Sequence, residues 1–175
     1  MFVLGIDPGL SRCGYACLEV SPGARQPRAV ALGVLTTPPS SPTPVRLAEL
    51  HGELVRLFDE LTPHVVAVEH VFFQVNRRTA MSVAQASGLA LAVAAGRACE
   101  VVQYTPNQVK ETVAGYGAAS KKQIQALVQA RLGLARPPRP FDAADAAALA
   151  LCHLAFAPLR RRLAAQQASA APAGA

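Results

Sequence analysis

The chain opens with the sequence FVLGIDPG at residues 2–9. An apolar run that meets Asp7-Pro8-Gly9 is typical of a short buried strand that ends in a turn, with a carboxylate as its last residue. Residues 13–20 and about 28–36 predict two further strands. Because the connections between these strands are short, we expect the three to form a β-meander.

Beyond the meander, helical and strand patterns alternate. Leucines at helical spacing predict a helix over residues 44–61, with Thr43 as its N-cap. We then expect a strand at 64–69, a helix at 78–98, a strand at 99–104, helices near 106–114 and 120–132, and a last helix at about 142–157. This order predicts one α/β domain with a five-stranded mixed sheet flanked by helices on both faces.

Size and composition limit the class of protein. A chain of 175 residues, of which 51% are hydrophobic, is typical of one globular domain. We assign residues 1–160 to that domain and expect the Ala-rich tail, residues 161–175, to be disordered. No apolar run reaches the roughly 18 residues of a membrane span, and no basic start marks a signal peptide. We therefore expect a cytoplasmic protein with no membrane contact.

The charge of the chain favours a polyanionic partner. There are 17 basic and 11 acidic residues, which gives a net charge of +6. Residues 105–139 alone carry six basic residues and one acidic residue, a net charge of +5. The four cysteines are widely spaced, which disfavours a zinc ribbon or a disulfide framework.

Four acidic residues occupy positions that suggest a metal site. Asp7 and Glu69 each end a predicted strand, and Asp142 and Asp145 lie one turn apart at the start of the last helix. Ligands of α/β sheets gather beyond the carboxyl ends of the strands. Clustered carboxylates need a cation, and oxygen ligands suit Mg²⁺ or Mn²⁺. Two such ions could drive phosphodiester hydrolysis by activating a water and stabilising the leaving oxygen.

Each of these acids also has a structural interpretation. Asp7 could close a turn, and Asp142 could cap its helix with Asp145 at the third helical position. Glu69 is harder to explain in this way, because a carboxylate after a buried strand needs a partner or a metal. His153 lies about 12 Å along the helix from Asp145 and is interpreted as a core histidine.

Two clusters predict contacts with nucleic acid. Ser120 begins a capping box whose first helical turn holds Lys121 and Lys122, where positive charge is unfavourable unless a phosphate binds there. Solvated lysines are the alternative. Two adjacent aromatic residues are followed closely by two arginines, and together they could stack a base and hold the backbone, although one aromatic could instead fill the core. These residues are Phe72, Phe73, Arg77 and Arg78.

Taken together, the motifs resemble those of the RuvC family of Holliday-junction resolvases. The matching segments occur in the family's order and span residues 2–157. They are LGIDPG at 4–9, VEHVF at 68–72, QVKETV at 108–113 and DAADA at 142–146.

The resemblance implies a ribonuclease-H-like fold and a homodimer that makes paired, symmetric nicks in four-way junction DNA. It also implies dependence on Mg²⁺ or Mn²⁺ and cooperation with the RuvA–RuvB branch-migration complex. The residues matching the family's metal-binding catalytic carboxylates are Asp7, Glu69, Asp142 and Asp145. Lys110 and Lys121 match its basic residues beside the scissile phosphate, and Phe72 matches the aromatic that engages unstacked bases.

The helix at 78–98 also favours a dimer, because it is apolar on most sides and must bury two of them. Two other functions remain open on the sequence. One is a ribonuclease-H-like nuclease that processes RNA, and the other is a junction-binding scaffold without catalysis. An actin-like ATPase would need a second large domain, for which 175 residues leave no room.

Overall fold

The computed structural model describes residues 1–70 and 77–170. Its centre is a five-stranded sheet with the strand order β3-β2-β1-β4-β5. The first three strands form the predicted antiparallel meander, and β4 and β5 run parallel to β1. The strand bounds are Phe2–Asp7 for β1, Arg12–Glu19 for β2, Arg28–Thr36 for β3, Val65–Glu69 for β4 and Glu100–Tyr104 for β5.

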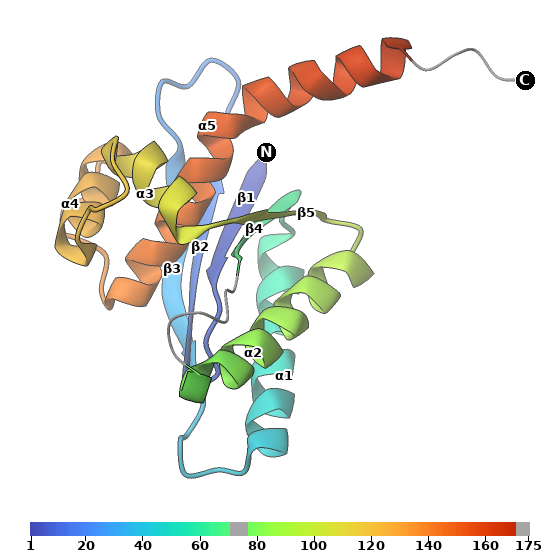
Figure 1. Cartoon of the computed structure of the whole chain (residues 1–175), viewed down its shortest axis with the longest axis vertical. Helices are drawn as coiled ribbons and strands as arrows, with labels where there is room; N and C mark the ends of the chain where they lie inside the picture. Colours follow the sequence, from blue (N-terminus) through green and yellow to red (C-terminus); the bar gives the residue numbers. More distant parts are fainter. Residues whose placement is uncertain (71–76, 171–175) are drawn as a thin grey trace, which may run out of the picture.

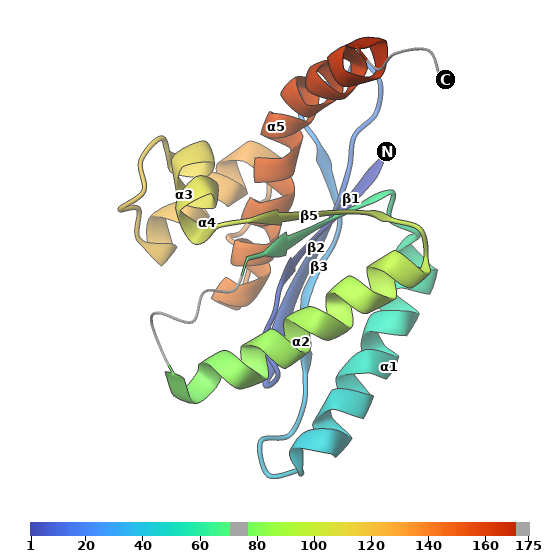
Figure 2. The ribbon, with the colours of Figure 1, turned by 45° about the vertical axis from the view of Figure 1, so that its right-hand side comes forward.

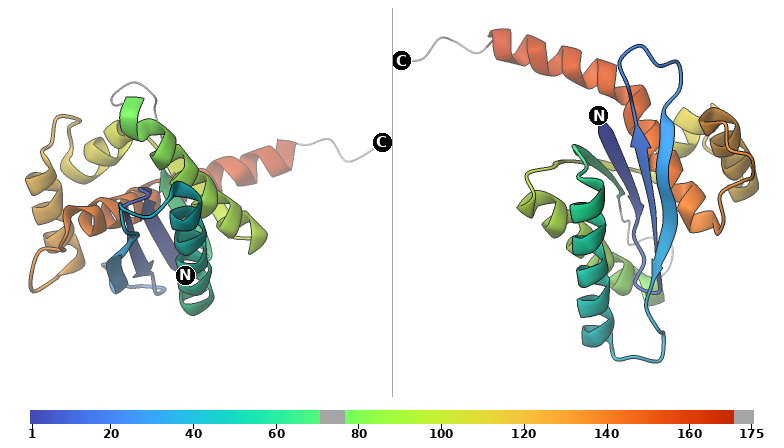
Figure 3. Two further views of the ribbon diagram at one scale, coloured as in Figure 1. Left: turned by 90° about the horizontal axis from the view of Figure 1, so that it is seen from below. Right: turned by 180° about the vertical axis from the view of Figure 1, so that it is seen from behind.

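Helices cover both faces of the sheet, as the sequence predicts. Figures 2 and 3 show α1 and α2 on one side of the strands and α3, α4 and α5 on the other. Each side has its own buried apolar core. The helix bounds are Thr43–Leu61 for α1, Arg77–Gly96 for α2, Pro106–Ala114 for α3, Lys121–Leu132 for α4 and Phe141–Ala170 for α5.

Strand alternation determines which residues face α5. Val3 in β1, Ala16 in β2 and Ala67 in β4 belong to the core on the α5 side. Side chains two residues apart in a strand point to the same face. Asp7 and Glu69, at the strand ends, therefore share the α5 side of the sheet.

Two glycines allow α5 to lie directly against the strands. A Cβ atom on Gly5 would overlap the backbone carbonyl of Ala146, and one on Gly14 would overlap that of Asp142. The buried part of α5 is rich in alanine, which also keeps the helix close to the sheet. This contact brings the first turns of α5 to the end of β1.

Two helix ends differ from the sequence expectation. The N-cap of α1 is Pro42 and not Thr43, which is already helical, and no side chain caps this end. The last helix does not end near residue 157 but continues through Pro158 to Ala170. The residues after Pro158 are mostly strong helix formers, which favours this extension. Figure 1 shows the helix changing direction and projecting beyond the sheet.

The extended helix affects two sequence-based expectations. The boundary at residue 160 falls inside α5, so the division into a domain and a tail stays a prediction. The part of α5 over Phe141–Arg160 is long and apolar enough to cross a membrane, but 56% of it is buried inside the fold. Since this part packs on the sheet, we interpret it as a core helix.

Candidate active site

Three of the four predicted carboxylates meet at one end of the sheet. Asp7 ends β1 and Glu69 ends β4, and these are neighbouring parallel strands in which Ile6 pairs with Val68. Asp145 reaches the same place from α5. The three line a cavity of about 280 Å³ together with Pro106, Val109, Lys110, Lys121, Ile124, Ala148 and Leu149.

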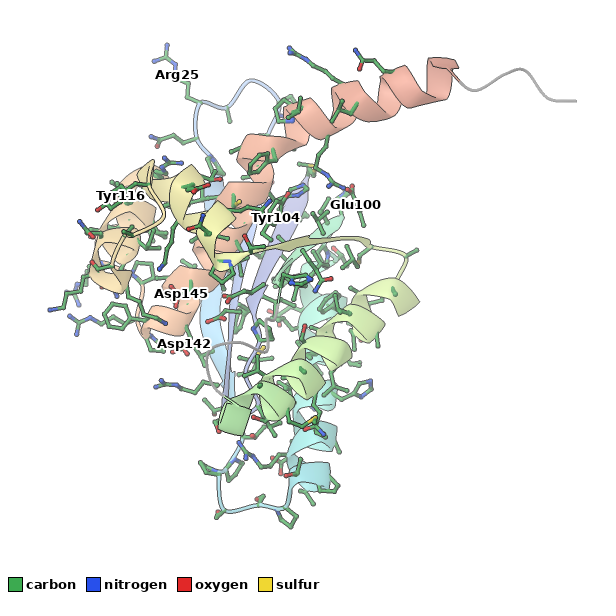
Figure 4. All side chains as sticks on the ribbon, in the orientation of Figure 1. Arg25, Glu100, Tyr104, Tyr116, Asp142 and Asp145 are labelled. Atoms are coloured by element: carbon green, nitrogen blue, oxygen red, sulfur yellow. The ribbon has the colours of Figure 1, made fainter. Side chains whose placement is uncertain are left out.

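Asp142 lies beside this cavity and does not line it. Figure 4 shows it near Asp145 on the same part of α5. Its carboxylate Oδ2 is 3.6 Å from the Nε atom of Arg12, the first residue of β2. Arg12 belongs to none of the motifs that the sequence shows. The only available signal was a basic residue shortly after the strand-ending Asp7, and the pairing itself depends on where α5 crosses the sheet.

Burial and neighbouring negative charges raise the pKa of two carboxylates, Asp7 and Glu69. Burial, followed by the charges of Glu69 and Asp145, raises the pKa of Asp7 to about 8. Burial and the charge of Asp145 also raise the pKa of Glu69, against a smaller opposing effect of Lys121. The site is therefore short of positive charge, and this is the condition that a bound cation relieves.

The donor set fits a hard divalent cation. Every acidic group at the site offers carboxylate oxygen, and among the residues that the structure describes no histidine or cysteine lines the cavity. Within the described residues, 1–70 and 77–170, no three acidic, histidine or cysteine side chains are already arranged as a metal cage. Basic side chains hold the two aspartates of α5 instead, Arg12 at Asp142 and Lys121 at Asp145.

Lys121 is held in place by local helix chemistry. It is the first residue of α4, after a complete capping box in which Ser120 and Gln123 bond each other's backbone N–H groups, as predicted. Its Nζ atom donates to Asp145 Oδ2 over 2.8 Å. This hydrogen bond raises the pKa of Lys121, so the side chain stays cationic. Lys110, from α3, lines the same cavity, whereas Lys122 is exposed and does not.

Comparison with known proteins identifies the family. A family model described as crossover junction endodeoxyribonuclease RuvC matches residues 3–153. The chain belongs to the RuvC family. A RuvC-family protein of Salinispora arenicola is 49% identical over 165 residues, which are 94% of each chain. One of Moorella thermoacetica is 45% identical over 162 residues, 93% of this chain and 96% of the relative.

A solved structure agrees with the assignment to the RuvC family. It is Thermus thermophilus RuvC in complex with a Holliday junction substrate, with a TM-score of 0.84 and 36% identity, covering 91% of this chain and 96% of that one. The expected ribonuclease-H-like fold is thereby confirmed. As a member of the RuvC family, the chain is an endonuclease of the crossover-junction class.

The remaining predicted DNA contacts are placed only in part. Phe72 and Phe73 lie outside the described residues. Arg77 and Arg78 begin α2, and their side chains also lie outside the described part.

Two further residues of this RuvC-family chain serve its packing. Arg131, counted in the basic segment, donates to the backbone carbonyl oxygens of Thr112 and Val113 and so joins α4 to α3. His153 is a core residue, as predicted, with its Nδ1 atom 3.2 Å from the hydroxyl of Tyr104. Neither belongs to the cavity of the carboxylates.

Proposed function

We propose that this chain resolves four-way DNA junctions by metal-dependent hydrolysis, with Asp7, Glu69, Asp142 and Asp145 as the catalytic, metal-binding carboxylates. The observation that carries the proposal is the cavity at the end of the sheet. It joins carboxylates from β1, β4 and α5 to two lysines, Lys110 and Lys121. Carboxylate oxygens can bind a cation that activates water, and ammonium groups can stabilise the charge on a phosphate, so the cavity suits phosphodiester hydrolysis.

Mg²⁺ is the cation we propose, with Mn²⁺ as a substitute, because the donors are carboxylate oxygens. When bound, such an ion makes water a better nucleophile and stabilises the leaving oxygen. The protein's own residues would hold the ion in a fixed position. Asp7 and Glu69 are fixed by neighbouring strands, and Asp145 by a helix that contacts the strands through glycine. Three rigid elements therefore hold the acidic oxygens in place.

The basic and aromatic residues have separate proposed roles. Lys110 and Lys121 would bind the scissile phosphate and oppose the charge that develops on it. Phe72 would stack on unpaired bases at the junction centre. Phe73 would stack on a base beside Phe72. The contacts with the surrounding DNA backbone would come from Arg77, Arg78 and Lys122.

Symmetric nicking requires two active sites, so we propose a homodimer. A four-way junction has paired strands, and one cavity of this kind cuts one strand at a time. Helix α2 suits a subunit interface, since it buries Ala86 and Ala90 on the sheet side while Met81 is 64% exposed. We further propose that the dimer acts in the cytoplasm with the RuvA–RuvB branch-migration complex.

Strand-specific nicking of a mobile synthetic four-way junction tests this function. Linear duplex, single-stranded DNA and structured RNA serve as controls, each in Mg²⁺, Mn²⁺ and EDTA. We expect paired, symmetric, ligatable nicks in the junction alone, and only with metal. Preferential cutting of RNA would support the RNA-processing nuclease instead. Junction binding without cleavage in either metal would support the non-catalytic scaffold.

A further inference from the structure

The two aspartates that open α5 have matching environments. Asp145 pairs with Lys121 over 2.8 Å, and the side chains are 20% and 67% exposed. Asp142 pairs with Arg12 over 3.6 Å, and the side chains are 19% and 61% exposed. In each pair a mostly exposed base from another element lies beside a largely covered acid. The sequence motifs account for Lys121 but assign nothing to Arg12.

The position of Arg12 follows from the sheet. It lies two residues before Gly14 in β2, so both point to the same face, and Gly14 contacts the backbone of Asp142. The guanidinium is therefore brought to the first turn of α5. In the strand order, β2 lies on the opposite side of β1 from β4. Arg12 thus adds a positive group on the side of Asp7 away from Glu69.

Because Arg12 is mostly exposed, its ion pair with Asp142 can be broken easily in favour of another partner. A surface ion pair with one partner mostly in water is weak, because solvent and salt screen it. A guanidinium binds phosphate through two parallel hydrogen bonds, which are charge-assisted and directional. A DNA strand crossing this end of the sheet would therefore compete well with Asp142 for Arg12.

We propose that Arg12 is a positioning residue that pairs with Asp142 in the free protein and moves to a DNA phosphate when the junction binds. The exchange leaves the Asp142 carboxylate available to a divalent cation only once substrate is present. Arg12 thereby couples DNA binding to completion of the metal site. This inference rests on the proposed function, since it assumes both the DNA substrate and the metal-binding role of Asp142.

Two binding measurements on the full chain test the proposal without using cleavage. Mn²⁺ binding to the free protein is measured by calorimetry, and four-way junction binding in EDTA is measured against salt concentration. The variants are Arg12→Ala, the charge-conserving Arg12→Lys, and Arg28→Ala as a matched control. Arg28, the first residue of β3, is also an exposed arginine paired with an acid. Its partner Glu19 lies at the opposite end of β2 from Arg12.

Arg12→Ala should tighten Mn²⁺ binding about fivefold, because it removes a positive charge 3.6 Å from the carboxylate of Asp142, one of the proposed metal ligands. It should also lower the slope of log affinity against log salt by about one for the junction. Arg12→Lys should stay close to the wild type in both measurements, and Arg28→Ala should change neither.

Unchanged or weaker Mn²⁺ binding by Arg12→Ala would overturn the competition between Arg12 and the cation. An unchanged salt slope would overturn the phosphate contact. If the wild-type chain binds neither Mn²⁺ nor the junction, the proposed function is wrong, and the role assigned to Arg12 is wrong with it.

Discussion

The backbone of Gly14 in β2 lies against the carbonyl group of Asp142 in α5, with no room for a side chain between them. Through this contact, and the similar one between Gly5 and Ala146, the helix reaches the sheet beside Asp7. The carboxylates of the candidate site come from elements far apart in the chain. Their arrangement therefore depends on how closely α5 approaches the strands.

Gly14→Ala tests this dependence. The added methyl group would overlap the Asp142 carbonyl, so the first turn of α5 must shift away from Asp7 and Glu69. Displacements of about 1 Å can cost an enzyme about 10²-fold in rate, and we expect junction nicking to fall by that order. Single-turnover nicking measures the rate, and circular dichroism reports whether the chain still folds.

Gly52→Ala is the matched control for this substitution. Outside the neighbouring backbone of α1 itself, a Cβ atom at Gly52 would meet no atom of the described residues within 4 Å. Replacing a helical glycine by alanine should stabilise the protein by up to about 1 kcal/mol and leave nicking unchanged. Equal loss of nicking in both alanine variants would show that the close approach of α5 is not what matters.

The raised pKa of Asp7 predicts a pH-dependent stability in the absence of metal. The folded chain keeps this proton up to about pH 8, whereas the ordinary value, expected in the unfolded chain, is 3.8. Between these values the folded state binds more protons, so its free energy of unfolding falls as the pH rises. Asp7→Asn lacks this titration. In urea unfolding with EDTA, its stability relative to the wild type should grow from about pH 5 to about pH 8. A difference that does not change with pH would argue against a buried, protonated Asp7.

The same proton links metal affinity to pH. A cation that binds Asp7 must displace its proton, so below about pH 8 the affinity should rise with pH. For one displaced proton the increase is about tenfold per pH unit. Calorimetric titration with Mn²⁺ in buffers of different ionisation enthalpy measures both the affinity and the protons released. Metal binding with no proton release near neutral pH would place the cation away from Asp7.

Lys121 and Lys122 offer a direct comparison between neighbouring lysines. Lys121 lines the cavity and bonds Asp145, whereas Lys122 is exposed outside it. Lys121→Ala should slow nicking at saturating junction concentration about 10- to 100-fold. This factor corresponds to the free energy of one charge-assisted hydrogen bond. Lys122→Ala should reduce only the salt dependence of junction binding. Equal effects of the two substitutions on the nicking rate would remove the special role of Lys121.

Much of the fold and part of the site could be predicted from local patterns. An apolar run that ends in Asp7 or Glu69 predicts both a strand and the place of its carboxylate, because parallel strands end at one edge of the sheet. The capping box at Ser120 is equally local.

Long-range packing could not be read in this way. The place where α5 crosses β2 determines that Asp142 pairs with Arg12 and that Asp145 lines the cavity. The predicted end of the last helix at about residue 157 is wrong. The helix continues because Pro158, usually a helix breaker, lies inside a segment of strong helix formers.

Junction cleavage by Asp7→Asn measures whether the carboxylates at the end of the sheet carry the reaction. Junction binding is measured in parallel with strand nicking, in Mg²⁺ and in Mn²⁺. We predict that the variant binds the four-way junction as tightly as the wild type or more tightly, since a negative charge near the phosphates is lost, and that it makes no nicks. Nicking at the wild-type rate in either metal would place the catalytic site elsewhere.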